Sequence, residues 1–302
     1  MIARSTLRQI TRHYPLNSPR RRLIEMRPSV ATDNGEFSTK SGLRLRAYAG
    51  GEDHICKQAY WFGDFDPWVD RTLARLARPG DTAIDVGANI GTTTLCLAPS
   101  VGAAGRVIAF EPLPSNSAML RSNIEANKFQ QVEVWSLALS DQTGRGCMLV
   151  SEGQAGQARM ETTAQKSWLG PGKGDRIEVG ISTFDEWALG RGLGPVSVCK
   201  IDVEGFEETV LRGMHRTLKN HMIQAFVIER HVGWQIVEDS MFNLFREGGY
   251  QLYRIDKGLR AVRYSPLGSR PKGQPSHDFV AVLLDSKAMM RIGKFCGKTS
   301  VP

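Results

Sequence analysis

The stretch Thr82-Ala83-Ile84-Asp85-Val86-Gly87-Ala88-Asn89-Ile90-Gly91-Thr92 decides the fold. Its first half is mostly apolar and short, which is typical of a strand that is covered on both faces. Gly87 and Gly91 then frame a turn that a Cβ atom at either position would obstruct, and residues from Thr92 onward predict a helix. A strand that enters a helix through such a turn directs several backbone N–H groups at one place, which suits a polar or anionic ligand group.

The residues around the turn indicate which ligand it suits. Dinucleotide-binding proteins use the pattern G-x-G-x-x-G, in which the second glycine lets the backbone approach a pyrophosphate. In this chain the spacing is Gly87-x-x-x-Gly91, and Asn89 stands at the place of that second glycine. Asp85, two residues before the turn, favours a ligand with a positive end and no pyrophosphate. S-adenosylmethionine, which carries an ammonium and a sulfonium, fits this description; an ordinary strand-to-helix turn is the alternative.

A second apolar run, residues 106–110, ends in Glu111 and Pro112. Glu111 follows the glycine turn by about 20 residues, the separation at which a doubly wound fold places a carboxylate at the tip of the neighbouring strand. A carboxylate at that tip accepts hydrogen bonds from ribose hydroxyls. The alternative is that Glu111 caps the helix that follows.

Five short motifs occur in order along the chain: Asp85-Val86-Gly87-Ala88-Asn89-Ile90-Gly91, Phe110-Glu111-Pro112-x-Pro114, Ala138-Leu139-Ser140-Asp141, Thr183-Phe184-Asp185 and Lys200-Ile201-Asp202-Val203-Glu204-Gly205. This ordered set resembles the FkbM family of S-adenosylmethionine-dependent methyltransferases over residues 80–285, with Phe184 where the family has leucine. The resemblance implies a class I methyltransferase (Rossmann-like) fold. It also implies an enzyme that methylates oxygen on sugars or secondary metabolites.

The alternation of strand and helix signals predicts an α/β fold with a mostly parallel seven-stranded sheet. The last two strands have only a loop between them, so they should pair antiparallel and give an antiparallel edge strand. Residues 142–180, rich in Gly, Gln, Ser and Thr, predict a β-hairpin insertion that either covers the methyl acceptor or is a simple surface excursion. The expected strands are 82–86, 106–110, 132–137, 196–201, 225–229, 250–255 and 279–284, and the expected helices are 91–98, 115–127, 206–218 and 240–247.

Charge divides the chain into a near-neutral domain and basic ends. The net charge is +8, yet residues 1–30 hold seven arginines against one glutamate, and residues 286–302 hold four cations and no acid. We expect a basic N-terminal extension (1–40), a lid and helix segment (41–79), the methyltransferase domain (80–285) and a basic tail (286–302). Because the basic character lies in the ends, the charge gives little support for a nucleic-acid substrate.

Two N-terminal segments allow more than one interpretation. Residues 1–22 fit a basic amphipathic helix on an anionic membrane surface, an organelle transit peptide, or a loosely packed extension, which we favour. The aromatic segment 60–66 fits a lid over the methyl donor or an anchor for the N-terminal extension. An amphipathic helix over 68–77 should follow it and end at Pro79-Gly80.

The cofactor site combines these motifs. Asp85 and the Gly87–Gly91 turn, including Asn89, should bind the methionine end, and Glu111 with Pro112 should bind the ribose. Ser140 and Asp141, after the third strand, are placed to meet the adenine edge; the alternative for Asp141 is a turn residue.

Methyl transfer to a hydroxyl needs the donor and acceptor held in line and a group that removes the proton. Asp202 and Glu204, two residues apart after the fourth strand, point the same way if the strand extends that far. One of them acting as the base is our first interpretation, a structural ion pair of Lys200 with Asp202 is the second, and a divalent cation is the third. His231, two residues after Glu229, is a further candidate for the proton, although a lone histidine is more often structural.

Six basic residues occur between the last two strands and predict an acceptor that carries phosphate, carboxylate or sulfate. A solvated basic loop is the alternative interpretation. The six are Arg254, Lys257, Arg260, Arg263, Arg270 and Lys272.

The sequence thus favours an S-adenosylmethionine-dependent O-methyltransferase that acts on a glycan or small molecule. The alternatives are a nicotinamide-dependent oxidoreductase, which Asn89 disfavours, a degenerate fold that serves as a binding subunit, and methylation of nitrogen or nucleic acid, for which the chain lacks an Asn-Pro-Pro-Tyr-type motif. None of the five cysteines forms a C-x-x-C pair, so zinc is not expected and a reducing, cytoplasmic compartment is. No apolar run reaches the ~20 residues that span a bilayer.

Overall fold

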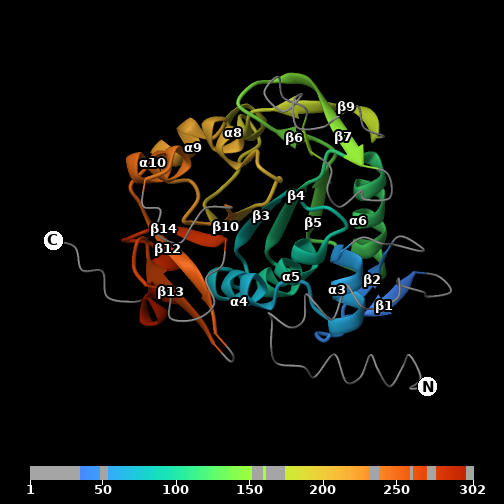
Figure 1. The fold of residues 1–302 in the computed structure, drawn as a ribbon, viewed down its shortest axis with the longest axis horizontal. Coiled ribbons are helices and arrows are strands. Elements are labelled where there is room, and N and C mark those ends of the chain that lie inside the picture. Colours follow the sequence, from blue (N-terminus) through green and yellow to red (C-terminus); the bar gives the residue numbers. More distant parts are fainter. Residues whose placement is uncertain are drawn as a thin grey trace.

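The computed structural model describes residues 35–47, 54–151, 159–160, 174–230, 238–258, 261–270 and 277–296. Its centre is an eight-stranded sheet with helices on both faces (Figure 1). From one edge to the other the strands are β13 (Val262–Pro266), β12 (Tyr250–Lys257), β14 (Asp278–Leu283), β11 (Ala225–Glu229), β10 (Val196–Ile201), β3 (Thr82–Val86), β4 (Arg106–Phe110) and β5 (Val132–Trp135).

Five neighbouring strands, from β11 through β5, run parallel, which confirms the predicted α/β architecture. Two details differ from the prediction. The predicted pairing of β12 with β14 is antiparallel, but β14 lies inside the sheet between β11 and β12. The edge is the unpredicted eighth strand, β13, in which buried Val262 and Tyr264 flank exposed Arg263. This short apolar–polar alternation was not predicted because it lies among basic residues that were interpreted as a loop.

Side chains of alternate strand residues enter two apolar layers. Ile84 and Val86 of β3 pack on one face, and Ala83 packs on the other. The first layer is covered by α8 (Glu207–Arg212), α9 (His215–Lys219), α10 (Ser240–Glu247) and α7 (Phe184–Ala188). The second is covered by α4 (Pro67–Leu76), α5 (Thr92–Val101) and α11 (Lys287–Ile292), while α6 (Pro114–Ala126) packs along β5.

Three segments differ from the predicted helix pattern. The helix expected over 206–218 is two short helices, because the chain turns at Gly213 and Met214 between α8 and α9. The expected basic tail begins with α11, whose Ala288 and Ile292 are fully buried, followed by η3 (Gly293–Phe295). The expected basic extension lies outside the described residues up to position 34.

The N-terminal segment forms a hairpin of β1 (Glu36–Ser38) and β2 (Arg44–Arg46), followed by α3 (His54–Phe62). Asn123 of α6 bonds both backbone groups of Arg46, at 2.6 and 3.2 Å. Tyr60, Trp61 and Phe62 are buried in a cluster with residues of β1 and β2. These three aromatic residues therefore anchor the N-terminal segment.

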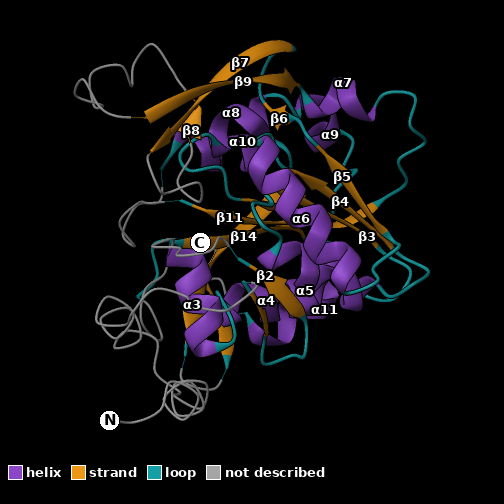
Figure 2. Ribbon diagram, turned by 90° about the vertical axis from the view of Figure 1, so that its right-hand side faces the viewer, coloured by secondary structure: helices purple, strands orange, loops and turns teal. Residues whose placement is uncertain are grey.

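The insertion after β5 is a separate four-stranded sheet that lies beyond the central one (Figure 2). Its order is β6 (Ala138–Leu139), β9 (Gly174–Ser182), β7 (Gly144–Ser151) and β8 (Arg159–Met160). Strands β7 and β9 pair antiparallel along their length, which confirms the predicted hairpin. Among the described residues, no helix is long and apolar enough to cross a membrane.

Candidate active site

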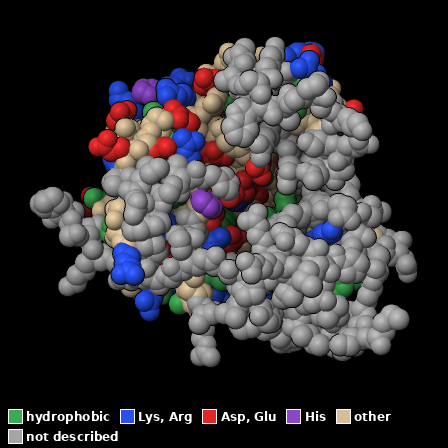
Figure 3. Space-filling model, in the orientation of Figure 1, with side chains coloured by type: hydrophobic (Ala, Val, Ile, Leu, Met, Phe, Trp, Pro, Cys, Tyr) green, Lys and Arg blue, Asp and Glu red, His purple; other side chains and the backbone are tan. Residues whose placement is uncertain are grey.

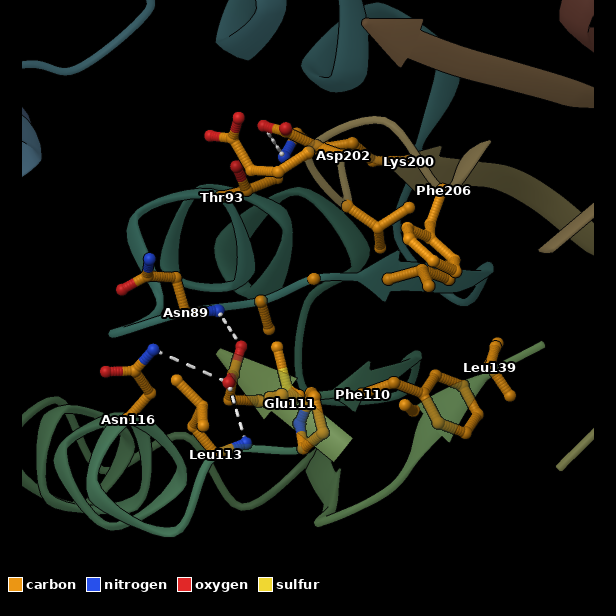
Figure 4. A pocket seen from close by; sticks show the side chains of 18 of the residues that line it. Asn89, Thr93, Phe110, Glu111, Leu113, Asn116, Leu139, Lys200, Asp202 and Phe206 are labelled. Atoms are coloured by element: carbon orange, nitrogen blue, oxygen red, sulfur yellow. Dashed lines mark hydrogen bonds and ion pairs between the residues drawn. The ribbon is translucent and has the colours of Figure 1, made fainter. Parts of the chain in front are cut away.

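A cavity opens at the carboxyl ends of β10, β3 and β4 (Figure 4). Seven of the predicted site residues line it: Gly87, Asn89, Glu111, Pro112, Lys200, Asp202 and Glu204. Four do not: Asp85, Gly91, Ser140 and Asp141. His231 lies outside the described residues. The cavity therefore gathers the glycine-turn and strand-tip motifs with the Lys200–Glu204 motif.

The glycine turn is shaped by close packing. Gly87 has φ +81°, and a Cβ atom there would lie 2.0 Å from the carbonyl oxygen of Asp202. Gly91 has φ +100°, and its Cβ would lie 2.6 Å from Leu120 Cδ1, so this glycine serves the packing of α5 on α6. Both positions thus exclude a side chain, as predicted.

The N–H groups of the turn are already used inside the protein. Those of Gly87 and Ala88 both donate to the Phe110 carbonyl at 3.0 Å, and that of Asn89 donates to Glu111 Oε2 at 2.7 Å. The expectation that the turn offers several free N–H groups to an anion is therefore wrong for these three. The turn instead fixes the position of the Glu111 carboxylate.

Glu111 is 4% exposed at the tip of β4 and lines the cavity. Besides Asn89, it accepts hydrogen bonds from Leu113 N at 3.0 Å and from Asn116 Nδ2 at 3.5 Å. Burial raises the pKa of this carboxyl to about 7, although the hydrogen bonds oppose the shift. Glu111 thus binds the backbone at the start of α6 and also faces the cavity, and its contact with a ribose stays a prediction.

Asp85 lies behind the cavity. It is fully buried on β3 and points to the α4 and α5 side, where its Oδ2 accepts a 2.6 Å bond from Thr94 Oγ1. Its Oδ1 is buried and has no hydrogen-bond partner among the described residues. Burial raises the pKa of Asp85, and the nearby Lys200 opposes this. Strands β3 and β10 set Asp85 beside Lys200 in register, and its carboxylate raises the pKa of that lysine.

Lys200 and Asp202 form an ion pair with 2.9 Å between Nζ and Oδ2, and their side chains are 10% and 23% exposed. Burial lowers the pKa of Lys200, but the carboxylates of Asp202 and Asp85 together raise it above its usual value. Lys200 is therefore an ammonium at neutral pH. The ion-pair interpretation of these two residues is present in the structure, and Asp202 also lines the cavity.

The loop after β10 holds a strained residue and the clamp that keeps it in place. Glu204 lines the cavity with φ +54°, a left-handed conformation that a non-glycine residue adopts only when its surroundings enforce it. Glu207 Oε1 accepts bonds from Val203 N at 3.2 Å and Gly205 N at 2.9 Å, on either side of Glu204. Glu207 closely follows the quoted motif, but its role depends on a loop shape that spacing alone does not reveal.

More carboxylates gather next to Asp202. Glu229 ends β11, and burial together with Asp202 and Asp278 raises its pKa. Lys257 bridges Asp66 at 2.7 Å and Asp278 at 2.8 Å. Figure 3 shows Asp and Glu side chains gathered in the hollow at the centre of this face. Within the described ranges, no group of His, Cys, Asp and Glu side chains is arranged to hold a metal ion.

The predicted basic loop is only partly available to an acceptor. Arg254 is fully buried, and its Nε donates to Asp256 Oδ1 at 3.0 Å. Lys257 is engaged as described above, and Arg263 and Arg270 are exposed. Arg260 and Lys272 lie outside the described residues. At least two of the six cations are therefore neutralised inside the fold.

The aromatic segment contributes one residue to the cavity. Phe65 lines it, together with Ile55 of α3 and with Thr92 and Thr93 of α5. The aromatic residues before Phe65 thus form the predicted anchor, and the lid over the methyl donor stays a prediction that only Phe65 of this segment is placed to serve. No sequence pattern indicated Asn116 or several apolar residues that also line the cavity, namely Leu113, Leu137, Met148, Met160 and Phe206.

Comparison of the chain with known proteins identifies a matching family and two similar proteins. The family model described as the methyltransferase FkbM domain matches residues 85–265. The 31-O-demethyl-FK506 methyltransferase FkbM of Streptomyces tacrolimicus is 30% identical over 159 residues, covering 45% of this chain and 60% of that protein. The 2-O-methyltransferase NoeI of Sinorhizobium fredii is 26% identical over 157 residues, covering 48% and 62%.

A solved S-adenosylmethionine-dependent O-methyltransferase of Thermotoga maritima is 12% identical with a TM-score of 0.42, covering 88% of this chain and 82% of that one. That likeness says nothing about the site. The chain spans about three-fifths of the length of the two curated relatives. Because the family model matches more than half of its residues, the protein belongs to the FkbM methyltransferase domain family.

Proposed function

We propose that the protein is an S-adenosylmethionine-dependent methyltransferase that methylates a hydroxyl group of a sugar, glycan or secondary metabolite. The observation that carries the proposal is the order of chemical groups along the carboxyl edge of the sheet. The acceptor class rests on the two relatives, whose names specify transfer to oxygen.

The chemical character of the cavity wall changes from strand to strand along the sheet. At β10 and β3 the cavity is charged and polar, with Lys200, Asp202 and Asn89. At β4 it presents the Glu111 carboxylate, and beyond β5 it becomes apolar around Leu139. The donor has the same sequence of parts: a charged amino-acid end, a ribose with two hydroxyls, and a flat base. A carboxylate suits the ribose diol, and an apolar wall suits the base.

The bound donor supplies a methyl carbon that its sulfonium makes electrophilic. The chain must then hold the acceptor oxygen in line and take its proton. Asp202 and Glu204 are the carboxylates that line the charged end of the cavity, and we assign the proton to Asp202. The Lys200 ammonium, 2.9 Å from Asp202 Oδ2, holds that carboxylate in place while the acceptor hydroxyl approaches.

The polarity of this region also bears on the acceptor. An anionic acceptor would meet the carboxyl groups of Asp202 and Glu204, which line the cavity, whereas a neutral hydroxyl compound meets hydrogen-bond acceptors. The carboxylates therefore favour a polyhydroxylated neutral acceptor. The five free cysteines accord with a reducing compartment, which we propose to be the cytoplasm.

Calorimetric titration with S-adenosylhomocysteine tests the proposal. Folded wild-type protein should bind, and Glu111→Ala should bind about ten- to a hundredfold more weakly, because hydrogen bonds to a charged group contribute about 1.5–3 kcal/mol each. Glu178→Ala, which removes a carboxylate paired with Arg145 on the exposed face of the insertion, is the matched control and should bind normally. Absence of binding by folded wild-type protein would favour a degenerate fold that serves as a binding subunit.

A further inference from the structure

We propose that the insertion hairpin is part of the donor site and that its two methionines, Met148 and Met160, hold the adenine base through apolar contact. This inference rests on the proposed function. It departs from the sequence-based expectations, in which the insertion covers the acceptor or is a surface excursion, and Ser140 and Asp141 read the adenine edge.

The two methionines are neighbours on the wall of the cavity. Met148 of β7 and Met160 of β8 are paired residues across the antiparallel ladder, so they stand side by side on one face of the insertion sheet. Both line the cavity, together with Leu137, Ala138 and Leu139 that follow β5. The part of the cavity beyond Glu111 is thus built from two sheets, with the methionines supplied by the insertion.

The insertion sheet leaves space for these long side chains. A Cβ atom at Gly146, two residues before Met148 on the same face, would lie 2.5 Å from Met160 Cε. Any larger residue at Gly146 would therefore displace the end of the Met160 side chain. The thioether of methionine is polarizable and makes favourable contacts with aromatic rings, which suits a flat purine.

The hairpin is fixed to the wall that it completes. Ala138 and Leu139, which line the cavity, form β6 and pair with Ile181 and Ser182 of β9. Leu113, Ala138, Met148, Val179 and Ile181 share one buried apolar cluster. The cluster joins the insertion to the segment that follows Glu111, so the methionines are held at a set position relative to the ribose carboxylate.

Ser140 and Asp141, which were expected to contact the adenine edge, form hydrogen bonds elsewhere or are exposed. Ser140 N donates to Ser182 O at 2.9 Å, and Ser140 Oγ donates to Asp141 Oδ1 at 3.3 Å. Asp141 is exposed, and neither residue lines the cavity. The base therefore meets apolar side chains where a hydrogen-bonding carboxylate was predicted.

Binding of S-adenosylhomocysteine to single variants tests the inference. Met148→Ala and Met160→Ala should each weaken binding about tenfold, since each removes most of an apolar side chain from the wall of the cavity. Met160→Leu should restore most of the affinity. Val150→Ala is the matched control, because Val150 lies on the same strand and packs against the same cluster without lining the cavity; it and Asp141→Ala should change the dissociation constant less than twofold.

A second measurement uses the unaltered protein. Hydrogen peroxide converts a methionine thioether to the sulfoxide and is reduced to water. Sinefungin, a donor analogue without sulfur, should slow oxidation of Met148 and Met160, as read by peptide mass spectrometry, and should leave Met290, which is 75% exposed on α11, unprotected.

The outcomes separate this inference from the proposed function. If folded wild-type protein binds neither ligand, the proposed function fails and the inference with it. If wild-type protein binds while both alanine variants bind within twofold of it, or while neither methionine is protected, the inference alone is overturned. If Asp141→Ala weakens binding of S-adenosylhomocysteine and the methionine variants do not, the adenine contacts Asp141, as the sequence predicted, and the inference is overturned.

Discussion

The two sides of the cavity hold their carboxylates by different means. At the tip of β4 a single carboxylate, Glu111, is buried among neutral donors, two from the backbone and one from Asn116. At the ends of β10, β11 and β14, several carboxylates share two lysines, Lys200 and Lys257. On the first side, burial among neutral hydrogen-bond donors fixes one carboxylate. On the second side, ion pairs with two lysines hold several carboxylates.

This difference predicts how each side responds to change. A carboxyl among neutral donors has an elevated pKa and responds to pH near neutrality. A carboxylate beside an ammonium stays ionised and responds instead to loss of its partner. The Glu111 side, which we propose for the donor, is therefore expected to respond to pH through one carboxyl. The other side, which we propose for the acceptor, also holds a carboxyl with a raised pKa, Glu229, and is expected to lose stability when one cation is removed.

Removal of Lys200 should have the largest effect. Lys200→Met leaves Asp85 and Asp202 without their shared cation, and breaking a buried ion pair in this way reduces the free energy of unfolding by about 3–5 kcal/mol. Partial exposure of Asp202 places the expected value at the lower end. Urea unfolding measures it, with Arg145→Met as the control, because the Arg145–Glu178 pair is exposed on both sides and should contribute less than about 1 kcal/mol. Equal effects from the two variants would contradict the contrast between the two sides.

The pH dependence of Glu111 is expected to be nearly as large. The pKa of its carboxyl rises from an ordinary value of 4.5 to about 7 in the folded protein, so the folded state favours the proton. The associated stability is fully present below pH 4.5 and is lost as the pH rises through 7. The loss amounts to about 3 kcal/mol at most, from 1.36 kcal/mol per pKa unit.

Unfolding of ligand-free protein at a series of pH values between 5 and 8 measures this loss. Glu111→Gln removes the titrating group and should flatten the profile while weakening S-adenosylhomocysteine binding. The pKa values of other buried acids, among them Asp85 and Glu229, are also raised, so these acids make the free energy of unfolding fall with pH in the same way. The contribution of Glu111 is therefore the difference between the wild-type profile and the Glu111→Gln profile. A Glu111→Gln profile as steep as that of the wild type would assign the slope to those other acids.

Loss of the Glu207 clamp should have a smaller effect. Glu207→Gln leaves one neutral acceptor where a carboxylate held Val203 N and Gly205 N, and we expect a loss of about 1.5–3 kcal/mol. Because the clamp fixes Glu204, which lies on the side that we propose for the acceptor, binding of S-adenosylhomocysteine should change much less than stability does. A variant with wild-type stability but a large loss of donor affinity would show that Glu207 serves the donor side.

The sequence predicted those features that arise from local patterns. Short apolar runs located the parallel strands, and the glycine spacing located the turn, because both follow from the geometry of a few consecutive residues. Asp85 was expected in the cavity, but it is fully buried beside Thr94, while its neighbour in register, Lys200, lines the cavity. How far a side chain near a strand end reaches toward the ligand depends on what packs around it, and apolar runs give no sign of that.

The apolar part of the site was hidden for a related reason. Met148 and Met160 lie in a polar, glycine-rich segment, and nothing near them in sequence indicates a binding wall. Their position follows from the pairing of β6 with β9, which brings the segment after β5 next to the end of the hairpin. Contacts between segments so far apart are decided by tertiary packing, so motif spacing could not have located them.

The Thr183-Phe184-Asp185 motif should give the smallest effect, and it separates a family signature from a site residue. Asp185 accepts bonds from Arg216 N at 2.6 Å, Thr217 N at 2.9 Å and Thr217 Oγ1 at 2.6 Å, so it caps α9 and does not line the cavity. Asp185→Ala should lower the free energy of unfolding by about 1–2 kcal/mol, as loss of a helix cap does, and should leave the dissociation constant for S-adenosylhomocysteine unchanged. Asp185→Asn, which keeps one acceptor oxygen, should recover part of the stability. If an Asp185 variant unfolds like the wild type but binds S-adenosylhomocysteine more weakly, this motif acts on the cavity. The cavity would then depend on a residue that lies on neither of its two sides.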